Sequence, residues 1–581
     1  MSAGANPSAD GPTVLPRRGP VSIGMGENSL FLLLAIIIGL FSGLAVVLFR
    51  IAIDYLRIEL LGSALEPSGI RLLIVPTLSG LLIAAVVNRY LPRVRGSGVN
   101  QTKAAVYVFE GYVPFRTVWG KFLTAALAIG SGQSLGPEDP SLQMGAGIAS
   151  ALGRWFRLSR KKVRLIAPVG AAAGLAAAFN APISAVIFVI EEVIGNWTAG
   201  ALGAIVMAAV SSVVVARVFL GPEPLFQVPV QQSVHPSELL AFAVLGVIGG
   251  VASLVFAKLI AYFRPRLMAL GRTSQYFQPA VAGLLIGMIG LRFPQVMGAG
   301  YEYIDQALHN RYGWRLLALL AALKIVSTSL SFVSGAPGGI FAPTLFIGAM
   351  LGGAVGAVEH HFVPWLPGSV GPYALVGMGV LFAGFLRVPF TSIFMVLEVG
   401  GNYSLILPVM ISNTLAYLIS RQYQSVSLFD MLARQDGIEL PSMEEQREEA
   451  TLRIEDAMRP APALVLHGED ALEEARRKAE TDSADFLLVR GTDGSWSGIR
   501  KEALERLAAE GDGARPLSSL VSMPAMPALH PDHPLDTALR RMADWPLLPV
   551  VHRADFRRLE GVISLEDILR AYRQQSERKG A

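Results

Sequence analysis

The sequence contains no cysteine, and only 16% of its residues are charged. The first absence excludes disulfides, thiolate catalysis and cysteine-ligated metal sites. The second, together with 52% hydrophobic residues and a mean hydropathy of +0.48, is atypical of a soluble protein. Uncharged stretches long enough to cross a bilayer recur at 29–49, 167–190 and 239–257. The composition therefore predicts a polytopic helical membrane protein rather than a large soluble helical core.

Changes in composition divide the chain into a tail, a membrane domain, a linker and a doubled polar module. The tail is polar and rich in Gly, Pro and Ser, which predicts disorder. The net charge of +4 is small, and basic residues beside the spans indicate orientation in a membrane rather than nucleic-acid binding. The predicted boundaries are 1–28 for the tail, 29–425 for the membrane domain (halves about 29–220 and 236–425), 426–456 for the linker, and 457–516 and 517–575 for the two units of the module.

The membrane domain contains an internal repeat. Residues 131–148 (SGQSLGPEDPSLQMGAGI) and 334–351 (SGAPGGIFAPTLFIGAML) share Ser-Gly, Gly, Pro and Gly at one offset of 203 residues (334 − 131). A second pair, 169–193 and 376–400, shares Gly, Pro and Glu at an offset of 207 residues (376 − 169). A Gly/Pro break repeated in both halves of an apolar chain is typical of transporters, whose binding sites are built from broken helices. Two such pairs in the same order predict tandem halves.

Three Gly/Pro breaks are candidates for the lining of an ion site: 96–100 (GSGVN), 136–140 (GPEDP) and 339–343 (GIFAP). Irregular backbone at membrane depth is tolerated where it lines protein or a watery cavity. Helices that start at such breaks aim unpaired N–H groups and positive dipole ends inward, and several together can hold an anion without a buried lysine or arginine. Ser97 would add a hydroxyl donor. The alternative is that these glycines only let helices pack closely.

Glu138 stands at the start of one such helix, where the second repeat has Phe341. A carboxylate there is a tethered anion that competes with a diffusible anion for the same donors, and protonation would release it. The alternative is a helix cap with no transport role. We favour a gate, because an intramembrane carboxylate is by default a functional hypothesis.

Glu191 and Glu192 follow the uncharged stretch 167–190. Glu191 has a repeat counterpart in Glu398, which indicates a structural role. Glu192 has none, because the second repeat has Val399 there, so Glu192 is the candidate for an asymmetric role in handling protons. A solvated helix end is the alternative.

With these residues placed, the chain resembles the CLC family of chloride channels and proton-coupled chloride antiporters. The family motif GSGIP appears as GSGVN at 96–100, G-K/R-E-G-P appears as GPEDP at 136–140, and GxFxP is intact as GIFAP at 339–343. The resemblance implies a homodimer in which each subunit holds its own pathway. It also implies anion contacts at Ser97, Gly98, Ile340, Phe341 and Phe429, a gating glutamate at Glu138 and an internal proton glutamate at Glu192.

The chain departs from the family pattern at several positions. Asn100 replaces a proline, Pro137 a basic residue and Asp139 a glycine. Asp139 places a second carboxylate beside the gate. Phe429 stands where the family usually has an anion-contacting tyrosine, so the ring is kept and the hydroxyl donor is lost.

The polar module repeats at an offset of 63 residues (561 − 498) and resembles a pair of CBS domains, with GVISLEDIL at 561–569 its clearest part. In that family the Ser/Thr and Asp of this stretch hold a nucleotide, which implies an adenine nucleotide at Ser564 and Asp567. The first unit has Lys501 and Leu504 at these positions, so at most one complete site is expected. A purely structural, dimerising module is the alternative.

Together these features predict an all-α, CLC-like membrane protein of two repeated halves with broken helices, followed by a small cytosolic α/β CBS pair. The predicted activity is antiport of chloride and protons across the inner membrane, with no required cofactor. A passive anion channel of the same fold is the alternative, and Glu192 discriminates the two, because only an antiporter needs an internal proton acceptor. A cation transporter would need acidic clusters in the spans. Neither an enzyme nor a metal site is expected, because no catalytic or metal-ligating constellation stands out.

Overall fold

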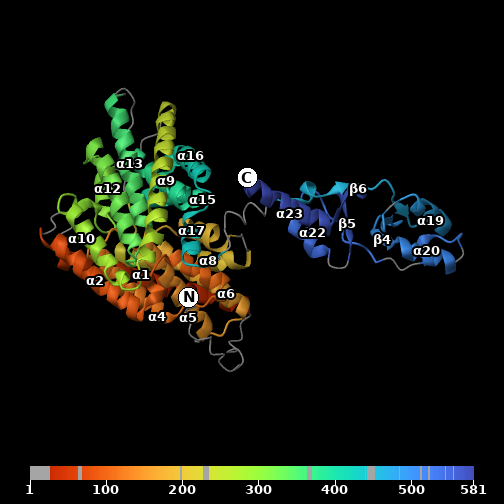
Figure 1. Ribbon diagram of the computed structural model, residues 1–581, viewed down its shortest axis with the longest axis horizontal. Coiled ribbons are helices and arrows are strands. Elements are labelled where there is room, and N and C mark those ends of the chain that lie inside the picture. The colour runs from red at the N-terminus through yellow and green to blue at the C-terminus, as the bar shows by residue number, and fades with distance from the viewer. Residues whose placement is uncertain are drawn as a thin grey trace. The chain divides into compact units, whose positions relative to one another are not determined.

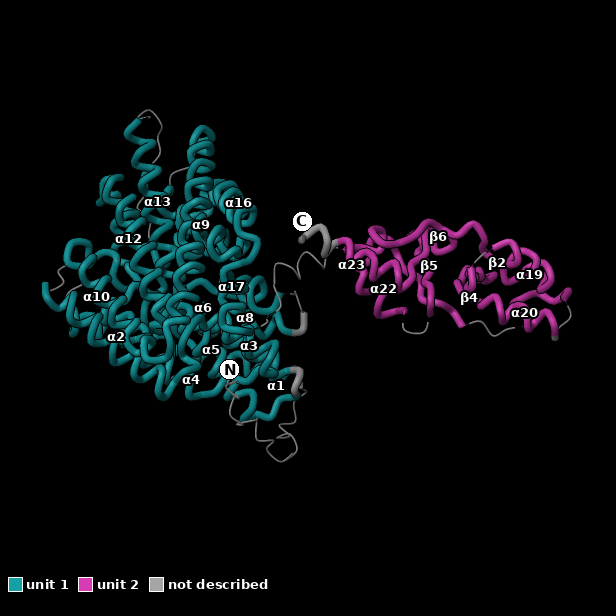
Figure 2. Tube along the Cα trace, in the orientation of Figure 1, with its two compact units in different colours: residues 1–443 teal, residues 444–581 magenta. Residues whose placement is uncertain are grey.

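A computed structural model describes residues 27–62, 69–195, 199–226, 235–362, 369–438, 440, 452–482, 484–510, 513–520, 524–542, 545–553 and 555–580. The chain forms two compact units, Met1–Met443 and Glu444–Ala581, which Figure 2 shows in teal and magenta. Most of the predicted tail and residues 441–451 of the predicted linker lie outside the described residues.

The secondary-structure elements of the first unit, within its described residues, are all helices (Figure 1). Among the described residues, eight helical segments are long and apolar enough to cross a membrane, as the composition predicts. The elements are α1 (Glu27–Leu61), α2 (Arg71–Tyr90), η1 (Pro92–Val94), α3 (Gly98–Tyr107), α4 (Phe115–Gly130), α5 (Glu138–Trp155), α6 (Arg160–Phe179), α7 (Pro182–Phe188), η2 (Val189–Ile194), α8 (Ala199–Leu220), η3 (Pro236–Glu238), α9 (Leu239–Ala269), η4 (Ser274–Tyr276), α10 (Gln278–Gly290), η5 (Pro294–Val296), α11 (Tyr301–Leu308), α12 (Trp314–Val333), α13 (Phe341–Phe362), α14 (Val370–Leu381), η6 (Phe382–Leu386), α15 (Pro389–Gly400), η7 (Tyr403–Leu405), α16 (Ile406–Tyr423) and α17 (Leu428–Gln435).

The uncharged stretch 167–190 is not one continuous helix. Asn180 adopts a left-handed conformation (φ 55°) that ends α6, and Pro182 starts α7. Arg387 (φ 61°) and Pro389 make the same break in the second half, before α15. A left-handed residue ends a helix, and a proline suits the first turn of the next one. The sequence repeat is therefore matched by a repeat of the backbone breaks.

The two halves meet through equivalent residues. Gly136 N–H donates to the Gly339 carbonyl at 2.7 Å, and Gly339 N–H donates to the Gly136 carbonyl at 2.8 Å. The two bonds form an antiparallel bridge between residues that the repeat makes equivalent. This bridge places the starts of α5 and α13 side by side.

Glycines set the close packing of helices around this centre. A Cβ added to Gly170 of α6 would lie 2.1 Å from the Gly145 carbonyl oxygen of α5. In the second half, a Cβ on Gly377 of α14 would lie 2.2 Å from the Gly348 carbonyl oxygen of α13. Small residues at matching positions let two backbones touch, which is how helices associate in a bilayer.

Helix α17 belongs to the first unit, although the predicted linker begins at residue 426. Its apolar side is buried through Leu428, Phe429 and Leu432. Burial of this side explains why this short segment packs with the membrane domain.

The described residues of the second unit form two three-stranded sheets with flanking helices. In the first sheet, β2 runs parallel to β3 and β3 antiparallel to β4; in the second, β6 pairs antiparallel with both β1 and β5. The elements are η8 (Ile454–Asp456), β1 (Arg459–Pro460), β2 (Leu466–His467), α19 (Leu472–Glu480), β3 (Phe486–Arg490), β4 (Trp496–Arg500), α20 (Lys501–Glu510), α21 (Leu517–Leu520), α22 (Leu535–Arg541), β5 (Leu547–His552), β6 (Asp555–Ser564) and α23 (Leu565–Gly580).

Each sheet of this unit has its own core, built from repeat-related residues. Leu466, Leu472 and Ala475 are buried in the first, and Leu529, Leu535 and Ala538 occupy the same places in the second. Strand β1 precedes the first sheet in the chain but pairs with β6 of the second, with Arg459 opposite Val562. The start of the module is thereby brought next to the start of α23.

The glycine contacts predict a difference between two Gly→Ala substitutions. Gly170→Ala should destabilise the protein by about 2 kcal/mol or more, because the new methyl would overlap backbone that cannot rotate away. Gly203→Ala in α8 should be tolerated, because the nearest atom to its Cβ is a Leu32 side-chain carbon 3.7 Å away. Thermal unfolding of both variants in detergent measures the effect, and equal melting temperatures would contradict the packing argument.

Candidate ion-transport site

The three predicted breaks come together in the first unit. The bridge between Gly136 and Gly339 joins the starts of α5 and α13. The start of α3 packs on the start of α5, because a Cβ on Gly98 would lie 2.6 Å from the Asp139 carbonyl oxygen. Segments separated by about 40 and 200 residues thus present three helix N-termini to one region. Unpaired N–H groups and helix dipoles make such a region favourable for negative charge.

Phenylalanine rings form one side of this region. Phe341 lies 5.2 Å from Phe188 and 6.3 Å from Phe429 between ring centroids, and Phe188 and Phe429 are 6.5 Å apart. All three side chains are fully buried, as is Ile340. The structure therefore brings the predicted anion-contact residues Ile340, Phe341 and Phe429 to the same place.

The carboxylate of Glu138 reaches across to the other half of the protein. It is completely buried, and its Oε2 accepts a 3.3 Å hydrogen bond from the Ala342 N–H in the first turn of α13. Its Oε1 accepts a hydrogen bond from the hydroxyl of Tyr301 at the start of α11. Gly136 leaves room for this arrangement, because a Cβ there would lie 2.4 Å from Oε2. Glu138 is therefore a bound anion at a helix start other than its own.

The neighbouring carboxylate, Asp139, turns toward α3. It is completely buried, and its Oδ1 accepts a 2.9 Å hydrogen bond from the Val99 N–H. The hydroxyl of Ser97 lies close to this carboxylate but forms no hydrogen bond of normal geometry within the described part of the chain. Two consecutive carboxylates thus serve two different helix starts.

Glu192 is buried, so the alternative of a solvated helix end is wrong. It lies in the π-helical segment η2, where its Oε1 accepts a 2.8 Å bond from the ammonium group of Lys103. The same ammonium lies 3.3 Å from Oδ1 of Asp430 on α17. Two carboxylates around one cation leave a formal charge of −1, so one added proton makes the cluster neutral.

Sequence reasoning missed Lys103 and Asp430. Lys103 is wholly buried in α3, and it was detectable only as an isolated charge five residues after Gly98, where α3 begins. Asp430 is 327 residues further along the chain, and nothing in the sequence pairs the two. Tyr301 was missed for the same reason, because its partner Glu138 is 163 residues away.

The repeat-related carboxylates Glu191 and Glu398 cap helices of opposite halves. Glu191 Oε2 accepts from the N–H of Thr391 at 2.9 Å and from its hydroxyl at 2.7 Å, at the start of α15. Glu398 Oε2 accepts from the N–H of Ser184 at 2.7 Å and from its hydroxyl at 2.6 Å, at the start of α7. These paired contacts fit the structural role that the repeat indicated for Glu191.

A second repeat-related pair consists of buried lysines. Lys121 donates to the carbonyls of Val94 and Gly96, both at 3.0 Å, just before α3. Lys324, 203 residues later (324 − 121), donates to the carbonyls of Val296 and Gly298, just before α11. The shared offset was the signal that could have revealed them. Each lysine fixes the loop from which a helix of the site begins.

The departure at Asn100 has a structural explanation. Its side-chain amide donates a 2.8 Å hydrogen bond to the Phe429 carbonyl, which a proline could not do. This bond ties α3 to α17. Phe429 keeps its position against Phe341 without a hydroxyl.

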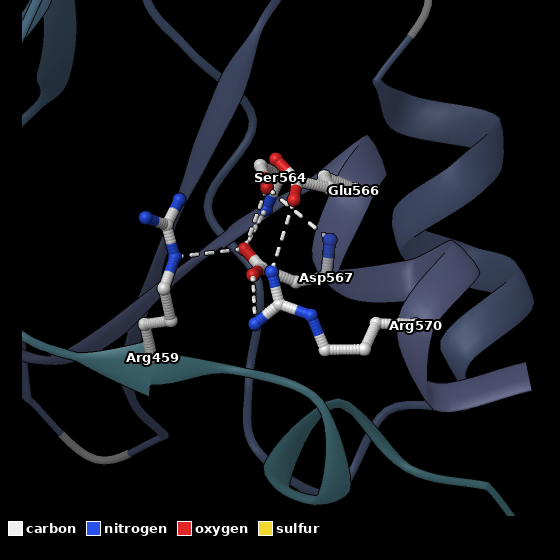
Figure 3. Close-up of polar contacts among 5 residues, drawn as sticks. All are labelled: Arg459, Ser564, Glu566, Asp567 and Arg570. Carbon is white, nitrogen blue, oxygen red and sulfur yellow. Dashed lines mark hydrogen bonds and ion pairs between the residues drawn. The ribbon is translucent and has the colours of Figure 1, made fainter. Parts of the chain in front are cut away.

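In the second unit, the predicted nucleotide residues Ser564 and Asp567 lie together at the start of α23 (Figure 3). Asp567 Oδ2 accepts from the Ser564 N–H at 2.9 Å and from its hydroxyl at 2.6 Å, which caps the helix. Arg459 Nε lies 2.9 Å from the same oxygen, and Arg570 lies 4.0 Å from Oδ1. In the first CBS motif (457–516), Leu504 is part of the core at the position that Asp567 has in the second motif.

Broken helices that meet at buried carboxylates, in a body whose described residues include eight segments able to cross a membrane, define a multi-pass membrane protein. Residues 79–421 match the family described as voltage gated chloride channel, and the chain belongs to that family. Residues 519–574 match the CBS domain family.

Individual relatives agree with this assignment. The chain is 33% identical over 414 residues to a protein of Vibrio campbellii named H(+)/Cl(-) exchange transporter ClcA, covering 69% of this chain and 88% of the relative. It is also 33% identical over 376 residues to a protein of Ralstonia nicotianae named putative chloride channel protein ClcB-like. The match covers 64% of this chain and 87% of that relative.

Solved structures show the same fold. A slow cyanobacterial Cl−/H+ antiporter matches with a TM-score of 0.65 at 24% identity, over 71% of this chain and 98% of that one. A eukaryotic CLC transporter matches with a TM-score of 0.61 at 20% identity, over 93% of this chain and 99% of that one. The predicted family and fold class are confirmed.

The buried cluster predicts a strong effect of removing its cation. Lys103→Met should destabilise the protein by about 3–5 kcal/mol, because Glu192 and Asp430 would be left buried beside each other without a counter-charge. Adding Glu192→Gln should recover part of this loss, because one of the two charges is then gone. Thermal unfolding of the single and double variants measures the coupling. Lys258→Met, at an exposed position, is the control, and additive losses would show that Lys103 and Glu192 do not interact.

Proposed function

We propose that this protein exchanges chloride for protons across a membrane. The observation that carries the proposal is the position of Glu138, whose carboxylate accepts a hydrogen bond from Ala342 at the start of α13. A carboxylate bound at a helix start occupies a place suited to a free anion. The names of the relatives support the same activity, since one is an H(+)/Cl(-) exchange transporter.

In this proposal, the carboxylate of Glu138 and the transported anion alternate. The ionised side chain holds the Ala342 N–H and the Tyr301 hydroxyl, so an anion has no access to these donors. Protonation removes the negative charge and weakens both hydrogen bonds, since charged acceptors bind more strongly than neutral ones. An anion then takes the vacated donors, with Ser97, Gly98, Ile340 and Phe341 as its further contacts. Return of the side chain expels the anion and releases the proton.

The inner proton acceptor in this proposal is Glu192, held by Lys103. Pairing with a buried cation keeps a carboxylate ionised in an apolar interior, where an isolated charge would be costly. Because Asp430 shares the same cation, the cluster can take up one proton and become neutral. A proton passing between Glu192 and Glu138 is thereby coupled to the movement of an anion.

The assembly and orientation are also proposed. We expect a homodimer in which each subunit holds a complete pathway, because the predicted anion and proton residues all belong to the compact unit 1–443 of a single chain. We place the protein in the inner membrane with the CBS pair on the cytoplasmic side. Basic residues beside the described spans support a defined orientation, because lysine and arginine favour the cytoplasmic face.

Exchange is tested by flux from liposomes that contain the purified protein. Under an imposed chloride gradient, the parent protein should move protons against chloride. Glu138→Gln should move chloride with no coupled protons, because its side chain cannot take up a proton. Glu192→Gln should retain chloride flux, and its proton flux should be at least tenfold lower than that of the parent protein. Chloride and pH electrodes record both ions in one experiment.

Two outcomes contradict exchange. Chloride flux without proton movement in the parent protein would make it a passive channel of the same fold. Absence of chloride flux would rule out both the exchanger and the passive channel. Glu398→Gln, which alters a helix cap outside the proposed pathway, is the matched glutamate control and should keep its coupling.

We further propose an adenine nucleotide as the ligand of the CBS pair. Asp567 is held in place by Ser564 and would receive ribose hydroxyls, and the guanidinium groups of Arg459 and Arg570, each more than half exposed, would meet the phosphates. The set of one fixed carboxylate and two arginines is chemically suited to a nucleotide.

Calorimetric titration of the full-length protein with ATP tests this ligand. The parent protein should bind, and Asp567→Ala should lower the affinity at least tenfold. Asp493→Ala, in an exposed loop of the first CBS unit, is the control and should bind as the parent does. No heat of binding at millimolar ATP would contradict the proposal and leave the pair with a structural role.

A further inference from the structure

Asp139 is the feature of the ion site that the proposed exchange leaves unused. The second repeat has Ala342 at the equivalent position, 203 residues later (342 − 139), so the carboxylate belongs to one half only. Side chains at this point lie at the first turn of α5, beside the gate Glu138. The asymmetry that distinguishes Glu138 from Phe341 therefore extends to the next residue.

The contacts of Asp139 place its charge on the start of α3. Its Oδ1 accepts from the Val99 N–H at 2.9 Å, and the Gly98 N–H and Ser97 hydroxyl lie close to the same carboxylate. Gly98 is required for this approach, because a Cβ there would lie 2.8 Å from Oδ1. These donors include the two residues, Ser97 and Gly98, that the proposed exchange assigns to the anion.

The carboxylates that cap helices with only a structural role differ from Asp139 in their hydrogen bonds. Glu191 and Glu398 each accept both an N–H and a hydroxyl from a single Thr or Ser, with normal hydrogen-bond geometry. Asp139 does not complete this pattern. Its Oδ2 and the Ser97 hydroxyl are both buried and lie near each other, but neither atom forms a hydrogen bond of normal geometry with the described residues. Buried polar atoms without partners are rare and indicate a missing ligand or a group that moves.

The charged groups that act on Asp139 come from two elements. Lys121 of α4 supplies a buried positive charge and holds the carbonyls of Val94 and Gly96, directly before Ser97. Glu138 of α5 supplies a neighbouring negative charge. An anion entering beside Ser97 would meet the same cation and would be repelled by Asp139.

We propose that Asp139 is a second tethered anion of the pathway, which competes with the transported anion for Ser97 and the start of α3. The inference rests on the proposed function, in which Ser97 and Gly98 contact that anion. Glu138 closes the α13 side of the site and Asp139 closes the α3 side. An anion binds beside Ser97 when Asp139 is protonated or turned away, so this protein binds anions more weakly than it would with the glycine usual in its family.

Chloride titration of the full-length protein by calorimetry tests the competition. Asp139→Gly and the isosteric Asp139→Asn should each lower the chloride Kd about tenfold or more at neutral pH. Asp139→Asn keeps an oxygen for the Val99 N–H, so it preserves the cap while removing the charge. Glu398→Gln is the matched control and should bind chloride as the parent does.

A second measurement isolates Asp139 from the gate. In a Glu138→Gln background, the chloride Kd should still fall as the pH is lowered, because protonation of Asp139 frees the donors. This dependence should disappear in Glu138→Gln/Asp139→Asn. An unchanged Kd in Asp139→Asn, or the same pH dependence with and without Asp139, would overturn the proposal and leave Asp139 as a helix cap. Neither calorimetric result depends on proton flux. A failure of the Asp139 proposal can therefore be told apart from a failure of the proposed exchange, which the liposome experiment tests.

Discussion

The need to satisfy helix starts inside a membrane protein shapes this structure more than any other constraint. Where a helix begins in the interior, its first N–H groups have no acceptor within the helix and no bulk water. Four carboxylates meet this need here, each on a helix other than its own: Glu191 on α15, Glu398 on α7, Glu138 on α13 and Asp139 on α3. The same chemistry that completes the fold also creates places that an anion can occupy.

Symmetry separates the structural members of this set from the candidates for transport. Glu191 and Glu398 are equivalent in the two halves, and a hydroxyl from the capped helix locks each of them. Lys121 and Lys324 likewise hold equivalent loops. Glu138 has no equivalent in the other half, and neither has Asp139. A side chain that the fold needs recurs in both halves. A side chain that is needed for a directed exchange of two ions can occur in one half alone.

The sequence was sufficient to predict the features that repeat or that lie close together in the chain. The matching segments 131–148 and 334–351 revealed the halves and the broken helices, because backbone breaks are encoded locally by Gly and Pro. The sequence does not predict which residues pair with single buried charges. Lys103 meets Glu192 and Asp430 only because α3, η2 and α17 pack together, and no local pattern encodes that contact. The break at Asn180 was also missed, because an apolar run does not show where a left-handed residue ends a helix.

The short helix α3 connects the two ends of the site. Its start receives Asp139, its first turn binds the Phe429 carbonyl through Asn100, and Lys103, about 7 Å further along at 1.5 Å per residue, holds Glu192 and Asp430. A helix of ten residues bends little, so a shift at one of these contacts is passed to the others. A change of charge at Glu192 and a change of position at Asp139 therefore act on one rigid element. Exchange of a proton for an anion requires such a link, because each ion must alter the site that the other one uses.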